Sequence, residues 1–196
     1  METMDRKAEI LAAFMKLVSR FGFDKTTMQD VAKEVGISVG VIYKDYKNKE
    51  DLITDYLLQM AGQFVRSCEP IVKKDLPPEQ LLRDFIIGVF RTLHDLVSQD
   101  RGFLQFVSGE DAFKYMRHNF KKEPLFLMEI TKMIEGILVR GVAEGAFQIE
   151  DPSKTASLFL KAFSDYGKQI FLGQELDKTI AEVEEMFSFL IRAVKK

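Results

Sequence analysis

Apolar side chains recur every three or four residues along most of the chain, whereas the two-residue alternation of a half-buried strand never lasts. Residues at that spacing share one face of an α-helix. The first clear stripe consists of Ile10, Phe14, Leu17, Val18 and Phe21. Gly22 follows it and is predicted to end the helix, because glycine tolerates a left-handed backbone. The pattern as a whole predicts an all-α fold with about nine helices.

Two short helices separated by a tight glycine turn are predicted after the first helix, at about residues 27–46. Thr26 and Gln29 have the spacing of a capping box, which marks the start of a helix. Gly36 is expected to end this helix, and Ser38 is expected to cap the next one. Two short helices with a tight turn, braced by a third helix, form the helix-turn-helix plan, whose second helix enters the DNA major groove.

Longer helices are predicted for the rest of the chain, between proline and glycine residues. Asn48 with Asp51 is predicted to cap a fourth helix that runs toward Pro70. Later helices are predicted at about residues 79–98, 125–144, 153–172 and 176–194. No flexible linker is evident, so the fourth helix is expected to join an N-terminal domain over residues 4–64 to a C-terminal domain over residues 65–196.

The charge of the chain provides no general attraction to nucleic acid, because the formal net charge is -2. The stretch from Lys33 to Lys49 is an exception, with four lysines against only Glu34 and Asp45. Any binding of DNA must therefore depend on the local placement of these lysines, and this stretch is the predicted footprint.

Composition excludes several classes of protein. Hydrophobic residues make up 46% and charged residues 30%, and no apolar run approaches the roughly 18 residues that span a bilayer. The start of the sequence also lacks the apolar region of a signal peptide, so a cytoplasmic protein with no membrane partner is expected. Cys68 is the single cysteine, and with His94 and His118 it lacks the spacing of a metal site. No metal, cofactor, catalytic residue or enzymatic activity is predicted.

The segments around the two short helices resemble the TetR family of bacterial transcription regulators nearly without gaps from Ile10 to about Leu57. The matching segments are Ile10 to Phe14, Phe21 to Phe23, Thr26 to Met28, Val31-Ala32, Val35 to Ser38, Gly40, Ile42-Tyr43 and Lys47 to Leu52. A further resemblance covers Gly141 to Phe147. The resemblance implies a DNA-binding helix-turn-helix domain over residues 4–64 and a helical ligand-binding and dimerisation domain over residues 65–196.

The resemblance also assigns roles to individual residues in the helix-turn-helix. It implies that Thr27, Tyr43 and Lys49 contact phosphates, that Ser38, Val39, Gly40, Val41 and Lys44 approach bases, and that Gln29 joins them. Many relatives place histidine where this chain has Asp45. A carboxylate there repels phosphate unless it accepts a hydrogen bond from cytosine or pairs with a lysine, and both alternatives remain open.

The C-terminal part is rich in phenylalanine, with 17 in the chain and no tryptophan. Rigid rings leave shaped gaps, so an apolar pocket for a small hydrophobic or aromatic effector is predicted there. The expected lining consists of Phe64, Phe90, Phe106, Phe126, Met133 and Phe163, with Cys68, His94 and Tyr166 as polar groups for orientation. The alternative is that these rings simply fill the core.

The last two predicted helices carry more apolar surface than one internal contact needs. One stripe consists of Phe159, Phe163, Tyr166 and Ile170, and the other of Ile180, Val183, Phe187, Leu190 and Val194, flanked by Met186, Phe189 and Ala193. A surplus apolar face usually has a partner, so a homodimer through these helices is predicted. A symmetric dimer in turn requires a near-palindromic double-stranded operator.

The sequence therefore predicts a DNA-binding transcriptional regulator, a repressor released from its operator by a small apolar or aromatic ligand. One alternative is a helical ligand-binding module that no longer binds DNA specifically, which Asp45 and the acidic balance of the N-terminal part favour. The other is an enzyme built on a helix bundle, which no catalytic motif supports.

Overall fold

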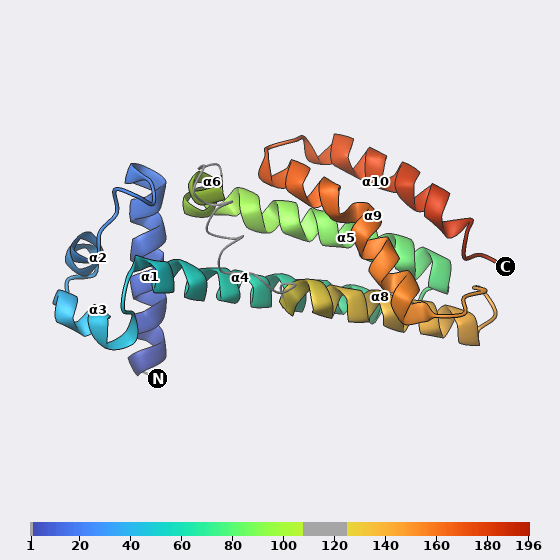
Figure 1. Ribbon diagram of the computed structural model, residues 1–196, viewed down its shortest axis with the longest axis horizontal. Coiled ribbons are helices and arrows are strands. Elements are labelled where there is room, and N and C mark those ends of the chain that lie inside the picture. The colour runs from blue at the N-terminus through green and yellow to red at the C-terminus, as the bar shows by residue number, and fades with distance from the viewer. Residues whose placement is uncertain (1, 108–124) are drawn as a thin grey trace. The chain divides into compact units, whose positions relative to one another are not determined.

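The computed structural model describes residues 2–107 and 125–196, and within these ranges the chain forms nine helices (Figure 1). The helices are α1 (Glu2–Phe21), α2 (Met28–Val35), α3 (Val39–Asp45), α4 (Lys49–Val72), α5 (Pro78–Gln99), α6 (Arg101–Val107), α8 (Leu125–Ala143), α9 (Pro152–Phe171) and α10 (Leu176–Ile191). The predicted all-α fold is confirmed, with a single isolated β-bridge between Phe147 and Lys195 in the described ranges. None of the described helices is both long and apolar enough to span a membrane.

The chain divides into two compact units. In the described part of the chain, unit 1 consists of residues 2–61 and 97–107, and unit 2 consists of residues 62–96 and 125–196. Helices α4 and α5 each contribute one end to unit 1 and the remainder to unit 2. The last turn of α5 and all of α6 therefore group with the N-terminal helices, although they lie far from them in the sequence.

The core of unit 1 forms along the buried face of α1. Ile10, Phe14 and Val18 are fully buried there, as the apolar stripe predicts. Phe21 is 57% exposed, however, so its predicted place in the core is wrong. It is the last residue of α1, and the chain turns away at Gly22, whose φ of 85° is left-handed, before another element covers the ring.

The start of α2 differs by one residue from its prediction. Thr27, not Thr26, occupies the N-cap, where its hydroxyl oxygen accepts a hydrogen bond from the backbone N–H of Asp30. Asp30 completes the box by accepting from the backbone N–H of Thr27, at 3.0 Å. These hydrogen bonds hold the pKa of Asp30 below its ordinary value of 3.8. Thr26 is buried and donates instead to the Gly22 carbonyl, at 2.8 Å.

The start of α4 follows its prediction closely. The side chain of Asn48 accepts a hydrogen bond from the backbone N–H of Asp51, and Asp51 accepts one from the backbone N–H of Lys47, both at 2.8 Å. The helix does not stop at Pro70 but continues to Val72. Pro70 has no backbone N–H to donate within the helix, and α4 ends two residues after it.

Unit 2 is built around α5, α8, α9, α10 and the end of α4. Helix α9 packs against both α8 and α10, which Figure 1 shows beside it. The fully buried side chains include Leu82, Phe85, Leu138 and Val183. Gly141 lies directly under the Phe147 ring, where a Cβ atom would be only 2.1 Å from a ring carbon, so this contact requires glycine.

Candidate nucleic-acid interface

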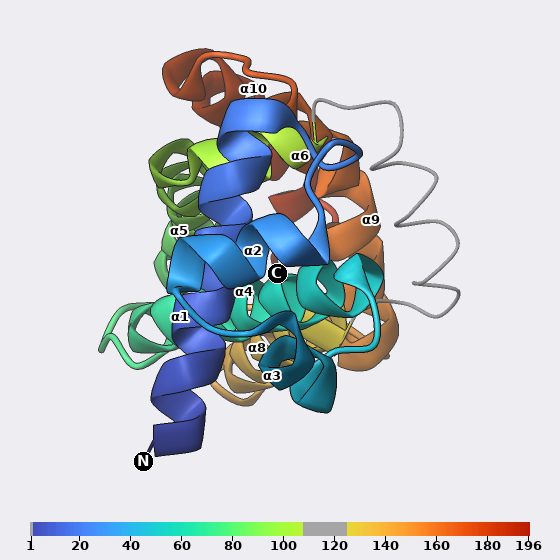
Figure 2. The same cartoon turned by 90° about the vertical axis from the view of Figure 1, so that its left-hand side faces the viewer.

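Helices α2 and α3 are joined by a turn of only three residues. Gly36 adopts a left-handed conformation with a φ of 78°, and its N–H and that of Ile37 bond back to carbonyls in the last turn of α2. This arrangement ends α2 sharply and starts α3 at Val39. Figure 2 shows α2 crossing α1, with α3 on the far side of the turn. The predicted helix-turn-helix is therefore present in unit 1.

Helix α3 has a buried inner side and an accessible outer side. Ile42 and Tyr46 are buried on the inner side, whereas Tyr43 is 47% exposed. Ser38 occupies the N-cap as predicted, although its side chain makes no capping hydrogen bond. None of the nine residues assigned to DNA is buried. Thr27, Gln29, Ser38, Gly40, Tyr43 and Lys44 are exposed, and Val39, Val41 and Lys49 are half-buried.

Tyr46 ties the end of α3 to α4. Its hydroxyl donates a hydrogen bond to Asp55 at 2.6 Å, and the Lys7 ammonium lies 5.4 Å from the centre of its ring. Burial, followed by the bond to Asp55, raises the pKa of Tyr46 far above its ordinary value. Tyr46 therefore stays a neutral hydrogen-bond donor at physiological pH, and it holds α3 in a fixed position on unit 1.

Asp45 forms an ion pair with Arg6 of α1. The Arg6 Nη2 atom lies 2.9 Å from a carboxylate oxygen of Asp45, whose side chain is only 18% exposed. This geometry favours an ion pair over a contact with cytosine, but the partner is an arginine of α1 and not the lysine that was expected. The pair also neutralises the carboxylate that would otherwise repel phosphate at the end of α3.

Lys49 is half-buried at the first position of α4. Its ammonium donates hydrogen bonds to the backbone carbonyls of Phe23 and Asp24, at 3.0 and 3.1 Å, and lies 4.5 Å from the centre of the Phe23 ring. The structure thus gives Lys49 three contacts inside unit 1, whereas the resemblance implies a contact with phosphate. Lys44 and Lys47, in contrast, are exposed and make no side-chain hydrogen bond or ion pair with any residue that the structure describes.

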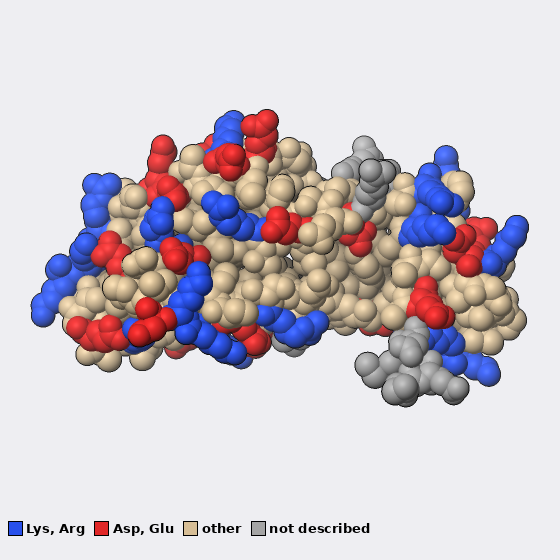
Figure 3. Space-filling view, turned by 180° about the vertical axis from the view of Figure 1, so that it is seen from behind, with Lys and Arg blue, Asp and Glu red and all other residues tan. Residues whose placement is uncertain are grey.

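The surface shows no single basic patch on the face seen in Figure 3, where lysine and arginine side chains are interspersed with acidic ones. Local pairing contributes to this balance. Lys16 of α1, for example, forms an ion pair with Glu34 of α2. Any attraction to phosphate at α3 would come from lysines such as Lys44 and Lys47, which pair with no acidic residue that the structure describes.

The residues predicted to line an effector pocket fall into separate groups. Phe90, Phe163 and Tyr166 meet in unit 2, with ring centres 6.3 to 6.4 Å apart, and Phe64 meets Phe126 edge-on at 6.0 Å. Met133 is half-buried and packs against the same core. These rings share one hydrophobic core. This arrangement is compatible with an effector pocket and also with side chains that simply fill the core.

Phe106 does not belong to that group, so its place in the predicted lining is corrected. It lies in unit 1, where its ring centre is 5.4 Å from that of Phe23. The error has a physical cause. Helix α6 packs against α1 although the two are far apart in the sequence, and local hydrophobic periodicity cannot predict such a contact.

The polar candidates of the predicted pocket differ in burial. Cys68 is fully buried, and burial raises the pKa of its thiol to about 11, which is typical of a small core residue. His94 is half-buried, and its Nδ1 atom lies 3.4 Å from the carboxylate of Asp95. The described residues contain no cluster of side chains suited to a metal ion, and His118 lies outside them.

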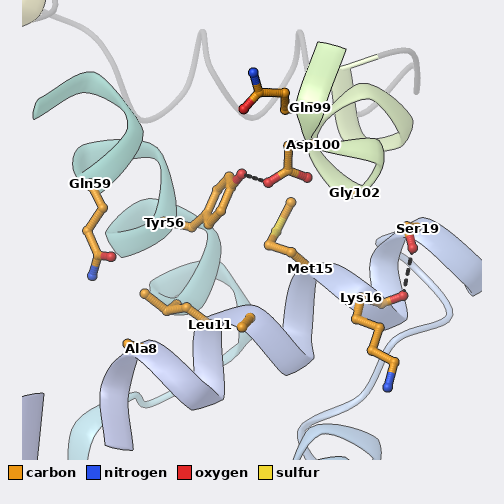
Figure 4. A pocket seen from close by; sticks show the side chains of 11 residues that line it. Ala8, Leu11, Met15, Lys16, Ser19, Tyr56, Gln59, Gln99, Asp100 and Gly102 are labelled. Atoms are coloured by element: carbon orange, nitrogen blue, oxygen red, sulfur yellow. Dashed lines mark hydrogen bonds between the residues drawn. The ribbon is translucent and has the colours of Figure 1, made fainter. Parts of the chain in front are cut away.

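A hollow of about 540 Å³ in unit 1 was not predicted from the sequence (Figure 4). Leu11 and Met15 of α1 form its apolar floor, and Tyr56 of α4 donates a hydrogen bond to Asp100 at the head of α6. Burial raises the pKa of Tyr56 far above its ordinary value. The lining comes from three stretches that lie far apart in the sequence, residues 8–19, 56–59 and 99–102, so no local motif could have indicated it.

Comparison with known proteins covers nearly the whole chain. Residues 10–56 match the family model "Bacterial regulatory proteins, tetR family", and residues 78–186 match "Tetracyclin repressor-like, C-terminal domain". The chain is 27% identical to the helix-turn-helix-type transcriptional regulator YhgD of Bacillus subtilis, over 94% of this chain and 95% of that protein.

Two solved structures share the fold. A TetR-family transcriptional regulator from Mesorhizobium loti superposes with a TM-score of 0.73 at 15% identity, over 100% of both chains. SmeT of Stenotrophomonas maltophilia, in complex with triclosan, superposes with a TM-score of 0.68 at 15% identity, over 97% of this chain and 91% of that one.

Proposed function

Because the chain belongs to the tetR family of bacterial regulatory proteins, we propose that it is a cytoplasmic repressor that binds a near-palindromic operator as a homodimer. A small apolar or aromatic ligand releases it from the operator. It is a DNA-binding transcriptional regulator and not an enzyme, as its curated relatives are regulators of this family.

The accessible outer side of α3 is the observation that carries the proposal. Gly40 lets the backbone approach the groove closely, and Lys44 is long enough to reach base edges. Val39 and Val41 suit contacts with thymine methyl groups. The ion pair between Arg6 and Asp45 neutralises a carboxylate that would otherwise repel phosphate at this surface.

A gel shift at low salt distinguishes this proposal from the alternative, a helical ligand-binding module that no longer binds DNA specifically. The duplex mixture is sheared chromosomal DNA of the host, with a large excess of a repetitive synthetic competitor. We expect a band that survives the competitor and that Lys44→Ala redistributes to other fragments, because Lys44 reads bases. A protein that shifts no fragment in this assay would be the ligand-binding module instead.

The dimer is proposed to form through α9 and α10. Leu158 of α9 and Phe189 of α10 are 56% and 67% exposed, which is unusual for large apolar side chains. Pairing these helices with those of a second copy would cover both. Such interfaces commonly bury about 2,000 Å² or more in total.

The effector is proposed to bind among the rings of unit 2. The meeting of Phe90, Phe163 and Tyr166 supports an apolar or aromatic ligand, and the complex of the related SmeT with triclosan is consistent with that class. Regulation requires that the ligand prefer the protein conformation that does not fit the operator. A ligand with equal affinity for the two conformations would not change their equilibrium.

Thermal unfolding with triclosan and, separately, with palmitate tests this site. A compound that raises Tm should also weaken operator binding, by roughly 5- to 150-fold for a typical coupling. Phe90→Leu should reduce both effects. Phe106→Leu is the matched control, because it makes the same change in unit 1 and should leave binding of the compound intact. A stabilising compound without any influence on operator affinity would contradict the sensing role.

A further inference from the structure

Lys49 stands where a positive charge is unfavourable. It is the first residue of α4, and the N-terminal end of a helix carries a partial positive charge that disfavours cations. Its ammonium is compensated by the carbonyls of Phe23 and Asp24 and by the face of the Phe23 ring. Two of its three N–H donors are therefore already used within the protein.

Phe23 connects Lys49 to two other helices of unit 1. Its ring meets Phe14 of α1 with centres 6.1 Å apart, and it meets Phe106 of α6 with centres 5.4 Å apart, both edge to face. The loop between α1 and α2 therefore contacts both Lys49, at the N-terminal end of α4, and the Phe106 ring of α6. Thr26, three residues farther along, anchors the same loop through its bond to Gly22.

The head of α4 in turn determines where α3 ends. Only residues 46–48 separate the two helices, and Asp51 of α4 accepts a hydrogen bond from the backbone of Lys47 in this connection. The hydroxyl of Tyr46 reaches Asp55 one turn farther along α4. A shift of the α4 head relative to the α1–α2 loop would therefore shift α3 relative to α2.

We propose that Lys49 is a positioning residue, which sets the recognition helix by fastening the head of α4 to the Phe23 loop rather than by binding phosphate. This inference rests on the proposed binding of operator DNA. Through the ring contact of Phe23 with Phe106, the same fastening makes the placement of α3 depend on α6. The lysine that the family resemblance assigns to phosphate thus acts from inside unit 1.

The salt dependence of operator binding separates the two roles of Lys49. Each lost phosphate contact reduces the slope of log K against log salt by about 0.9, whereas a lost positioning contact lowers affinity at every salt concentration alike. For Lys49→Ala we expect about tenfold weaker binding with an unchanged slope. The measurement uses an operator selected from a random duplex pool, at a temperature well below the Tm of the variant. Lys49→Arg should restore most of the affinity, because guanidinium can bond the carbonyls and stack on the ring.

Two further variants complete the experiment. Lys47→Ala is the matched control, since it removes an exposed lysine close by, and any phosphate contact that it makes will appear as a reduced slope. Phe23→Leu carries no charge change, yet it should weaken binding as Lys49→Ala does, and the double variant should be little worse than either single one. If Phe23→Leu does not fold, the slope of Lys49→Ala decides alone.

Each outcome has one meaning. A reduced slope for Lys49→Ala overturns the positioning role and restores the phosphate contact. Unchanged affinity in a fully folded Lys49→Ala protein overturns it as well, because the lysine would then be merely structural. Failure of the unmodified protein to bind any duplex contradicts the proposed function itself, and the two failures are therefore distinguishable.

Discussion

Asp45 stands where the family resemblance leads one to expect histidine, and its side chain pairs with a partner 39 positions earlier in the sequence. A carboxylate beside a DNA-binding helix costs affinity unless something neutralises it. The Arg6 guanidinium does so from α1, although nothing in the local sequence indicates that Arg6 lies nearby. The ion pair lies at the C-terminal end of α3, and we infer that it holds α3 against α1.

Asp45→Asn tests this role, because the change keeps the shape of the side chain and removes its charge. We expect the preferred operator sequence to stay the same, while the free energy of unfolding falls by about 1 kcal/mol and Tm falls by roughly 2–4 °C. Sequence selection with both proteins, together with thermal unfolding, measures the two effects. A changed base preference at one operator position would show that Asp45 reads DNA.

Cys68 gives a prediction about chemical reactivity. Burial raises the pKa of its thiol from 9.0 to about 11, so the thiolate is about a hundredfold scarcer at pH 8 than in an unperturbed cysteine. Because the folded pKa is raised, thiolate appears only as the pH rises toward 11. A chromogenic disulfide reagent at pH 8 should leave the native protein almost unlabelled and react fully in denaturant. Equally fast labelling of the native protein would contradict the buried placement.

Single residues were predictable where their partners are local and were missed where the partners are distant. The Asn48 and Asp51 cap and the left-handed Gly36 follow from neighbours within a few residues. The capping box of α2 was misplaced by one residue, because Asp30 takes the role expected of Gln29. The internal contacts of Lys49 with residues 25 and 26 positions away carry no local signal at all.

At the scale of elements, the position of α6 depends on one glycine. A Cβ atom on Gly102 would lie 2.3 Å from the backbone carbonyl oxygen of Met15, so α6 touches the backbone of α1 itself. Asp100 caps α6 by accepting a hydrogen bond from the backbone N–H of Phe103, at 2.8 Å, and it also accepts one from Tyr56 of α4. Helix periodicity predicted most of the helices, but it says nothing of such a close approach.

Gly102→Ala should therefore push α6 away from α1 and destabilise the protein by about 1–3 kcal/mol, as overpacking commonly does. The matched control is Gly136→Ala in α8, where a Cβ atom would meet nothing within 4 Å. That change should stabilise the protein by up to about 1 kcal/mol, because alanine favours the helix. Denaturant unfolding measures both variants. A Gly102→Ala protein as stable as the unmodified one would show that α6 does not lie this close to α1.

For the whole molecule, binding to a symmetric operator would require two copies of the chain. Phe189 of α10 is the most exposed ring in the described part of the chain, at 67%. An aspartate in its place would carry an unpaired charge into an apolar interface, so Phe189→Asp should give a monomer in sedimentation at micromolar concentration. Val139→Asp is the control, since Val139 is 50% exposed on α8, and it should leave the dimer intact. The reverse pattern would place the interface on α8.

Selection of bound duplexes from a random pool tests most directly whether α2 and α3 read a specific symmetric operator. We expect one enriched sequence with two-fold symmetry, whose half-site centres lie about 34 Å apart or a multiple of that distance. A pool in which repeated rounds enrich no sequence, or only a single half-site without its symmetric counterpart, would show that the protein does not read a symmetric operator as a dimer.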